Sequence, residues 1–229
     1  MASSASLPSP DVLAAAAALN VYDDTGNEVS FGSLIKDQKT IVVFIRHFWC
    51  GSCQQYVIQL ASVRKEALEQ ANTRLLVIGC GDWKLIKDYC GENHSEHGSL
   101  DAQLNIPRYY STSTNDRTGL TDFKGGMYAD PSRKLYHTFG LIETLDRTPA
   151  GQEKRSYLGK SLIGNVLASI WGGPLKHPQH IGKQGNISQL GGDYIFGPGE
   201  TCIYASPMKH TEDHVEVEEL MKEAGIPYP

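Results

Sequence analysis

Two continuous apolar runs stand out in the first half of the chain. One is the Ile41 to Ile45 run inside KTIVVFIRHF (39–48), and the other is RLLVIG at 74–79. Continuous runs rich in β-branched residues are typical of strands that are covered on both faces, as in a parallel sheet. Between the two runs, apolar residues recur at helical spacing through about residue 70, which predicts a connecting helix.

A second helix is expected after the second strand. Asp82 directly precedes WKLIKDYC and is a typical helix N-cap, because a carboxylate accepts hydrogen bonds from the free backbone N–H groups of the first turn. The order strand, helix, strand, helix predicts a right-handed βαβ unit. In such a unit, the residues that follow the first strand lie at the carboxyl edge of the sheet, where ligands usually bind.

The same patterns predict further elements along the rest of the chain. Proline and capping residues begin helices, whereas glycine ends them or turns a hairpin. The expected elements are a helix after Ser9-Pro10-Asp11, a strand at 127–129, a helix begun at Asp130-Pro131 and stopped at Gly140, a helix at 160–171, a hairpin at 191–205 and a terminal helix at 215–224.

Residues 91–126 interrupt this pattern. The segment is polar, rich in Ser, Thr, Asn and Gly, and only weakly periodic, and a loop of such length is uncommon inside a compact domain. We therefore expect a flexible insertion within a single domain that spans residues 1–229.

Composition and charge narrow the class of protein. A net charge of −5 argues against a nucleic-acid partner, and no apolar run reaches the roughly 20 residues needed to cross a membrane. The alanine-rich start lacks the basic region of a secretory signal, so we expect a short helix there. Five cysteines, an odd and scattered number, suit a reducing compartment, and we expect a cytoplasmic protein.

The candidate chemistry lies in Cys50-Gly-Ser-Cys53, directly after the first strand. A cysteine at a helix start has its thiolate stabilised by unpaired N–H groups and the helix dipole, which lowers its pKa. Cys50 is therefore the candidate attacking thiolate. Cys53 lies one turn further on the same face and can resolve a mixed disulfide or a sulfenic acid. Arg46 and His47 are candidates to add positive charge beside Cys50.

Two other interpretations of the pair are inert burial and metal binding. Free cysteine is often buried, and Cys80, Cys90 and Cys202 are best explained as core or surface thiols. A zinc site needs further ligands, and none of the histidine pairs has the spacing of a known zinc module, so we expect no metal. These pairs are His94 with His97, His177 with His180, and His210 with His214. No phosphate-binding or dinucleotide fingerprint is present, so no tightly bound cofactor is expected.

Longer segments carry a resemblance. IVVFIRHFWCGSCQQYV, RLLVIGCG, YADPSRKLYHTFGL and QLGGDYIFGPGETCIYA resemble the peroxiredoxin-like 2 family of AhpC/TSA-type antioxidant proteins, which includes prostamide/prostaglandin F synthase. The resemblance covers residues 7–224 except for about 94–124. It implies an α/β, thioredoxin-like fold, with a central mixed sheet flanked by helices, an N-terminal helical extension and a long insertion. It also implies a redox-active disulfide formed by Cys50 and Cys53.

The chain departs from related families at three positions. True peroxiredoxins have a proline and a threonine or serine where Val43 and His47 stand, and thioredoxins have a buried acid where Phe44 stands. The disulfide chemistry is therefore better supported than a fast peroxidase.

The resulting expectation is an enzyme, a thiol–disulfide oxidoreductase of peroxiredoxin-like antioxidant type. It would act on a peroxide, an endoperoxide or a disulfide, and an external thiol reductant, thioredoxin-like or NADPH-linked, would regenerate it. One alternative is a lipid endoperoxide reductase, with an apolar groove lined by Phe48, Trp49 and the loop after Trp171. The other is a non-catalytic module that binds a partner or a metal.

Overall fold

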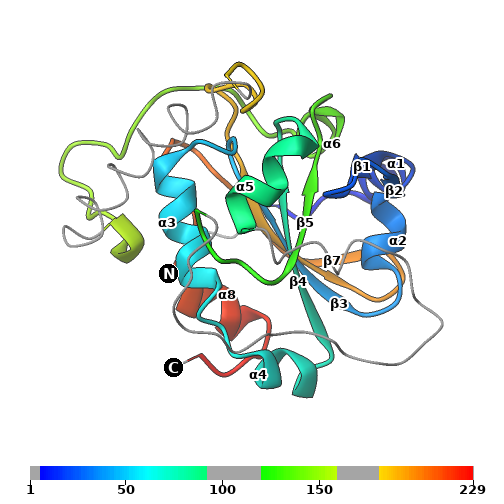
Figure 1. The fold of residues 1–229 in the computed structure, drawn as a ribbon. Coiled ribbons are helices and arrows are strands. Elements are labelled where there is room, and N and C mark those ends of the chain that lie inside the picture. Colours follow the sequence, from blue (N-terminus) through cyan, green and yellow to red (C-terminus); the bar gives the residue numbers. More distant parts are fainter. Residues whose placement is uncertain (1–5, 92–119, 159–180, 229) are drawn as a thin grey trace.

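A mixed sheet of seven strands lies between two layers of helices (Figure 1). The computed structural model describes residues 6–91, 120–158 and 181–228. The strands in these ranges are β1 (Asn20–Tyr22), β2 (Glu28–Ser30), β3 (Lys39–Phe44), β4 (Thr73–Gly79), β5 (Gly126–Ala129), β6 (Gly192–Gly197) and β7 (Thr201–Pro207).

The helices are mostly short. The α-helices are α1 (Pro10–Ala17), α2 (Phe31–Ile35), α3 (Gly51–Leu60), α4 (Lys65–Gln70), α5 (Ile86–Cys90), α6 (Lys134–Thr138) and α8 (Val217–Glu223), and the single-turn 3-10 helices are η1 (Trp83–Leu85) and η3 (Ser156–Leu158). As expected, Ser9 caps α1 and accepts from the Val12 N–H, and Asp82 caps η1 and accepts from the Lys84 N–H.

The predicted βαβ unit forms the centre of the sheet. The strand order is β2-β1-β5-β4-β3-β6-β7, in which β3 runs parallel to β4, and β4 to β5, while the outer pairs are antiparallel. Because β3 has neighbours on both edges and helices on both faces, its apolar run is continuous, as the sequence predicted. The thioredoxin-like α/β fold class is thereby confirmed.

Alternate residues of the central strands point into two separate cores. Val43 and Val77 face the layer of α3, α4, α5 and α8, whereas Val42 and Phe44 face α1, α2 and α6. Figure 1 shows α3 and α8 on one side of the sheet and α1 and α2 on the other. The carboxyl end of β3 thus emerges between the two cores, directly before the CxxC segment.

Several element boundaries differ from the expectation. The helix after Cys53 is two helices, because the chain turns at Ala61 and the Ser62 hydroxyl donates to the Gln59 carbonyl, a local bond that competes with the helical ladder. Helix α6 begins at Lys134 rather than at Asp130, whose carboxylate instead accepts from the Leu135 N–H and the Ser132 hydroxyl. Strands β1 and β2 and helix α2 were not predicted.

The end of the expected insertion belongs to the packed fold. Thr121 donates its N–H and its hydroxyl to the Tyr89 carbonyl, Phe123 is buried, and Gly126 begins β5. The remainder of the insertion, 92–119, and the helix expected at 160–171 lie outside the described residues.

One buried tyrosine fixes the ends of the two central strands. The Tyr136 hydroxyl of α6 lies 2.8 Å from both the Ile45 and the Ile78 carbonyl oxygens, and the Ile45 N–H donates to the Ile78 carbonyl at 2.9 Å. This arrangement sets the direction in which the chain leaves β3. It therefore positions Arg46 and the segment that follows.

We expect Gly191→Ala to destabilise the fold strongly. A Cβ at Gly191 would lie 1.7 Å from the Phe44 carbonyl oxygen, so the backbones of β3 and the segment before β6 would have to separate. Chemical denaturation should show a loss of about 3 kcal/mol or more. Gly126→Ala is the matched control, because its Cβ would approach only side-chain atoms of Leu76 and Tyr128. Equal losses for the two variants would contradict this account.

Candidate functional site

The two cysteines of the CxxC segment lie at the amino end of α3. Cys50 is the N-cap residue, with extended backbone angles, and Cys53 lies in the first turn. Both are free thiols in this structure, Cys50 being 3% exposed and Cys53 fully buried. Of the two, only Cys50 has any contact with solvent, which fits the order of attack predicted from the sequence.

Arg46 contacts all three sulfur atoms of this region. Its guanidinium Nη1 lies 3.3 Å from the Cys50 Sγ, its backbone N–H donates to the Cys53 Sγ at 3.4 Å, and its carbonyl accepts from the Cys80 Sγ at 2.9 Å. The other guanidinium nitrogen, Nη2, donates to the Ile187 carbonyl at 2.5 Å. The arginine is buried, so its charge acts on Cys50 with little screening by water.

The pKa of Cys50 is lowered well below the usual thiol range. A hydrogen bond from the Cys53 thiol is the largest cause, and burial opposes it. The charges of His47 and Arg46 and a hydrogen bond from Ser52 act in the same direction as the Cys53 thiol. A thiolate at Cys50 is therefore favoured at neutral pH, and the thiolate is the nucleophilic form.

The pKa of Cys53 moves in the opposite direction. Burial raises it, and the hydrogen bond to Cys50 and the charge of Cys50 raise it further. Cys53 therefore remains protonated beside the Cys50 thiolate. In such a pair, one sulfur is an ionised nucleophile and the other remains a protonated thiol.

His47 lies beside the pair, and its charge helps to lower the pKa of Cys50, in the direction that the sequence suggested. Burial lowers the pKa of its own imidazole, the charge of Arg46 lowers it too, and only Cys50 opposes them. Arg46 and His47 therefore act on Cys50 in the same direction, while burial disfavours the charged form of the His47 ring. The His47 Nδ1 has no hydrogen-bond partner among the described residues.

Hydrogen bonds and short backbone segments form a closed ring that includes Cys50, and we call it the rim. On one side, Arg46 joins Cys50 to Ile187, and the Ser188 carbonyl then accepts from the Thr144 N–H at 2.8 Å. On the other side, the Ser52 hydroxyl lies 3.2 Å from the Cys50 Sγ and donates to the Thr211 carbonyl at 3.1 Å. The Thr211 N–H donates to the Asp146 carbonyl at 2.8 Å, which closes the ring.

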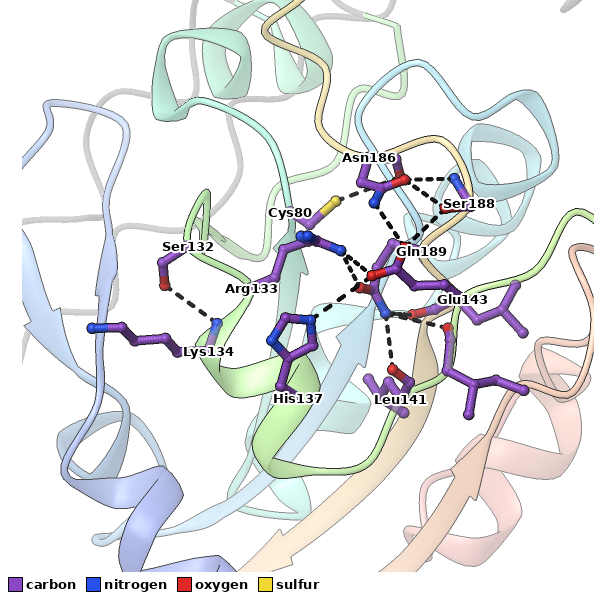
Figure 2. A network of polar contacts seen from close by, with 12 residues as sticks. Cys80, Ser132, Arg133, Lys134, His137, Leu141, Glu143, Asn186, Ser188 and Gln189 are labelled. Atoms are coloured by element: carbon purple, nitrogen blue, oxygen red, sulfur yellow. Dashed lines mark hydrogen bonds and ion pairs between the residues drawn. The ribbon is translucent and has the colours of Figure 1, made fainter.

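Glu143 fastens the loop that carries the Ile187 carbonyl, as Figure 2 shows. Its carboxylate pairs with the Arg133 guanidinium on one side and accepts from Asn186 and Ser188 on the other, at 2.9 and 3.0 Å. Gln189 completes the attachment by donating to backbone carbonyls, the nearest being that of Leu190 at 3.0 Å. This network, rather than α3 itself, holds the loop against Arg46.

The histidine pairs do not form a metal site in the described ranges. His214 is bonded to Asp193 at 3.0 Å, with both side chains fully buried, and its ring stacks on Tyr56 at a centroid separation of 4.3 Å. His210 is separately engaged, with its Nδ1 accepting from the Glu212 N–H. No group of three His, Cys, Asp or Glu residues there could hold a metal. His94, His97, His177 and His180 lie outside the described residues.

The aromatic residues beside the motif differ in exposure. Phe48 is fully buried, packs against Tyr89 with ring centroids 5.7 Å apart, and leaves no room for a Cβ on Gly79. It is therefore a packing residue and does not line a groove. Trp49 is half-buried, and the loop after Trp171 lies largely outside the described residues.

Sequence comparisons show that the chain is similar to peroxiredoxin-like proteins. A family model described as AhpC/TSA antioxidant enzyme matches residues 116–210, a segment that follows the two cysteines of the motif. Peroxiredoxin-like 2C of Mus musculus and of Homo sapiens are each 28% identical to this chain, over 93% of it and 80% of their own length. The similarity to AhpC/TSA antioxidant enzymes thus covers part of the chain, and the similarity to peroxiredoxin-like 2C covers most of it. A chloroplastic thioredoxin-like protein of Arabidopsis thaliana is 27% identical over 89% of this chain and 69% of its own.

Solved structures of peroxiredoxins share the fold of this chain. Peroxiredoxin Q of Xanthomonas campestris superposes with a TM-score of 0.53 at 9% identity, over 96% of this chain and 92% of its own. The reduced 2-Cys peroxiredoxin of Plasmodium vivax gives a TM-score of 0.50 at 9% identity, over 90% and 75%. In the described ranges, no helix combines the length and the apolar character that a membrane span requires.

We expect Arg46→Met to make Cys50 less acidic. The variant loses the guanidinium but keeps the apolar stem, so the Cys50 thiolate loses its nearest lasting positive charge. The rate at which iodoacetamide alkylates Cys50 can be followed across pH by mass spectrometry. The midpoint, the pH at which this rate is half-maximal, should move toward the ordinary thiol range, and the rate at neutral pH should fall by about tenfold. His47→Gln, measured in parallel, separates the contribution of His47, whose charge also lowers the pKa of Cys50. An unchanged midpoint in Arg46→Met would contradict the assignment.

Glu143→Gln should act on Cys50 from a distance. The substitution weakens the bond to Arg133 and frees the 186–189 loop, so the Ile187 carbonyl holds Arg46 less firmly. The alkylation midpoint should move in the same direction as in Arg46→Met but by a smaller amount. Glu69→Gln, which breaks only the exposed pair with Lys65, is the matched control. Identical pH profiles for the two variants would show that the loop does not position Arg46.

Proposed function

We propose that the protein is a thiol–disulfide oxidoreductase of peroxiredoxin-like antioxidant type, in which Cys50 attacks and Cys53 resolves. The observation that carries the proposal is the opposite displacement of the two pKa values within one buried CxxC pair. Attack needs an ionised sulfur, whereas the resolving sulfur must stay protonated until the first has reacted. Similarity to peroxiredoxin-like proteins supports the same class of activity.

With a hydroperoxide as substrate, the Cys50 thiolate forms a bond to the terminal peroxide oxygen while the O–O bond breaks. The alcohol leaves after taking up a proton, and Cys50 becomes a sulfenic acid. Cys53 then loses its proton and attacks the Cys50 sulfur, releasing water and forming a disulfide. The peroxide gains two electrons, and the two thiols lose them.

With a disulfide as substrate, the same residues perform two exchanges. The Cys50 thiolate attacks one sulfur and releases the other half as a thiolate, which leaves a mixed disulfide. Cys53 then displaces the second half and forms the Cys50–Cys53 disulfide. The sequence favours this route over fast peroxide reduction, because Val43 and His47 replace the proline and the hydroxyl residue of true peroxiredoxins.

Arg46 and His47 are proposed as the groups that support Cys50. Arg46 holds the thiolate through its contact at 3.3 Å, and it remains charged through the cycle. The His47 ring, whose Nδ1 has no hydrogen-bond partner among the described residues, is proposed to supply a hydrogen bond to the leaving group, which takes its proton from solvent.

A thiol reductant completes the cycle. The disulfide must be returned to two thiols by an external dithiol, thioredoxin-like or linked to NADPH, with no tightly bound cofactor in the protein itself. The odd and scattered set of five cysteines suits a reducing compartment. The cytoplasm remains a prediction, and the Arabidopsis relative is described as chloroplastic.

The two cysteine variants should fail at different steps. Cys50→Ser should abolish turnover of hydroperoxide and of disulfide, because the attacking thiolate is lost. Cys53→Ser should still react once and then accumulate a sulfenic acid or mixed disulfide on Cys50. Intact-mass analysis after one equivalent of hydroperoxide or of oxidised glutathione distinguishes the two variants, since only the parent protein should lose two hydrogens as a Cys50–Cys53 disulfide.

Cys202→Ser is the control for this experiment. Cys202 is half-buried in β7, and burial raises the pKa of its thiol to about 11, so its loss should leave turnover unchanged. Equal turnover by Cys50→Ser and the parent protein would refute the proposed function.

A further inference from the structure

A polar cavity of about 690 Å³ adjoins the rim around Cys50. It lies beside the loop that follows β7, and its lining includes His210, the residue next to Thr211 of the rim. Two short contacts connect this loop to the reactive sulfur, from the Thr211 carbonyl to the Ser52 hydroxyl and from there to the Cys50 Sγ. The wall of the cavity is therefore connected to the reactive sulfur through Thr211 and Ser52.

The charged side chains of the cavity leave an excess of positive charge. Its cations are Arg147, Arg155 and Lys209, and its carboxylates are Asp146 and Asp213. Asp213 is occupied, because it pairs with Arg155 at 3.3 Å and accepts from the Lys209 N–H at 2.9 Å. This excess stands out in a chain whose net charge is −5.

Arg147 and Lys209 supply the free charge of the cavity. Both side chains are exposed, and neither guanidinium nor ammonium group makes a hydrogen bond or ion pair within the described ranges. Asp146 is the one carboxylate of the lining that has no cationic partner there. Within the lining, the cations Arg147 and Lys209 thus outnumber the one unpaired carboxylate, and the charge of Arg147 also acts on the neighbouring Glu212.

His210 adds a hydrogen-bond donor that has no acceptor. The side chain is only 7% exposed, and its Nδ1 accepts from the Glu212 N–H at 3.3 Å. In the neutral ring, the proton then resides on Nε2, because the two nitrogens cannot both be acceptors. The Nε2 has no hydrogen-bond partner among the described residues, since Asp213 lies 3.8 Å away.

Apolar side chains also lie along the rim. Ile142, Leu145 and Ile187 are each more than half exposed, and they flank the backbone groups that complete the hydrogen-bond ring. The rim is thus bordered by exposed apolar side chains as well as by the cationic lining of the cavity. An organic molecule with one anionic group matches this combination better than hydrogen peroxide does.

We propose that this cavity is an anion subsite, which binds a carboxylate of an organic disulfide or hydroperoxide while the S–S or O–O bond reaches Cys50. The proposal rests on the proposed function, since it assigns the substrate class of the same thiolate. Arg147 and Lys209 supply the attraction, and the His210 Nε2–H supplies a directed bond. The subsite acts on substrate selection and not on the chemistry at sulfur.

Two disulfide probes of similar reactivity test the subsite. The probe 5,5′-dithiobis(2-nitrobenzoate) carries a carboxylate on each ring, whereas 4,4′-dithiodipyridine is uncharged at neutral pH. Each reports attack by Cys50 through the coloured thiol that it releases, after subtraction of the rate for Cys50→Ser. The measured quantity is the second-order rate constant for the charged probe divided by that for the uncharged probe. A general change in the reactivity of Cys50 cancels in this ratio.

The double variant Arg147→Gln/Lys209→Gln should lower this ratio by about threefold to tenfold at low ionic strength, while the rate with the uncharged probe stays the same. High salt should lower the ratio for the parent protein toward that of the variant, because it screens exposed charges. These two results together support the subsite.

The matched control is Lys36→Gln/Lys222→Gln. It removes the same charge from two exposed side chains near the amino end of β3, at the sheet edge opposite Cys50. An equal fall in the ratio for both double variants would show a general charge effect, and an unchanged ratio for both would show no anion preference. Either result overturns the subsite and leaves the proposed function intact. Failure of Cys50 to react with either probe would overturn both.

Discussion

The organisation of this site depends on one buried arginine. Arg46 leaves the end of β3 with its backbone N–H at Cys53, its carbonyl at Cys80 and its guanidinium at Cys50. An arginine in such a place is costly to desolvate unless its donors are satisfied, and the Ile187 carbonyl and the thiolate provide two acceptors. The thiolate and the guanidinium therefore stabilise each other, and neither would be favourable alone in this environment.

The same interaction connects the charge state of the site to the stability of the fold. The pKa of Cys50 is depressed in the folded protein, so its thiolate contributes stability that is fully present above the unfolded-state pKa and is lost as the pH falls through the folded value. Cys53 has a raised pKa, so its contribution is present below the unfolded-state pKa and is lost as the pH rises through the folded value. The pair thus contributes most to folding stability when Cys50 is ionised and Cys53 is protonated. This is the form that the proposed chemistry uses.

The sequence predicted the core of this fold and the chemical motif, because both follow from local patterns. The apolar runs of β3 and β4 and the position of Cys50 at a helix start are readable from spacing alone. Strands β1 and β2 have only three residues each, too few to show a period, and they depend for their conformation on pairing with each other and, through β1, with β5. Glu143, Ile187 and Thr211 escaped prediction since their role comes from long-range backbone contacts, for which a single sequence carries no signal. His47 acts on Cys50 as its residue type suggested, but the burial that lowers the pKa of its ring could not be predicted from the sequence.

Because the rim forms only in the folded protein, the reactivity of Cys50 differs between the unfolded and the folded chain. Its members come from the regions of residues 46–52, 142–146, 187–188 and 211, which are separated by long stretches of chain. In a nascent or unfolded chain, Cys50 therefore has no arginine held beside it and reacts as an ordinary thiol. The reactive thiolate is a property of the completed tertiary structure, so oxidants encounter a selective target only after folding is finished. Local opening of the 186–189 loop would return Cys50 to that ordinary state without unfolding the sheet.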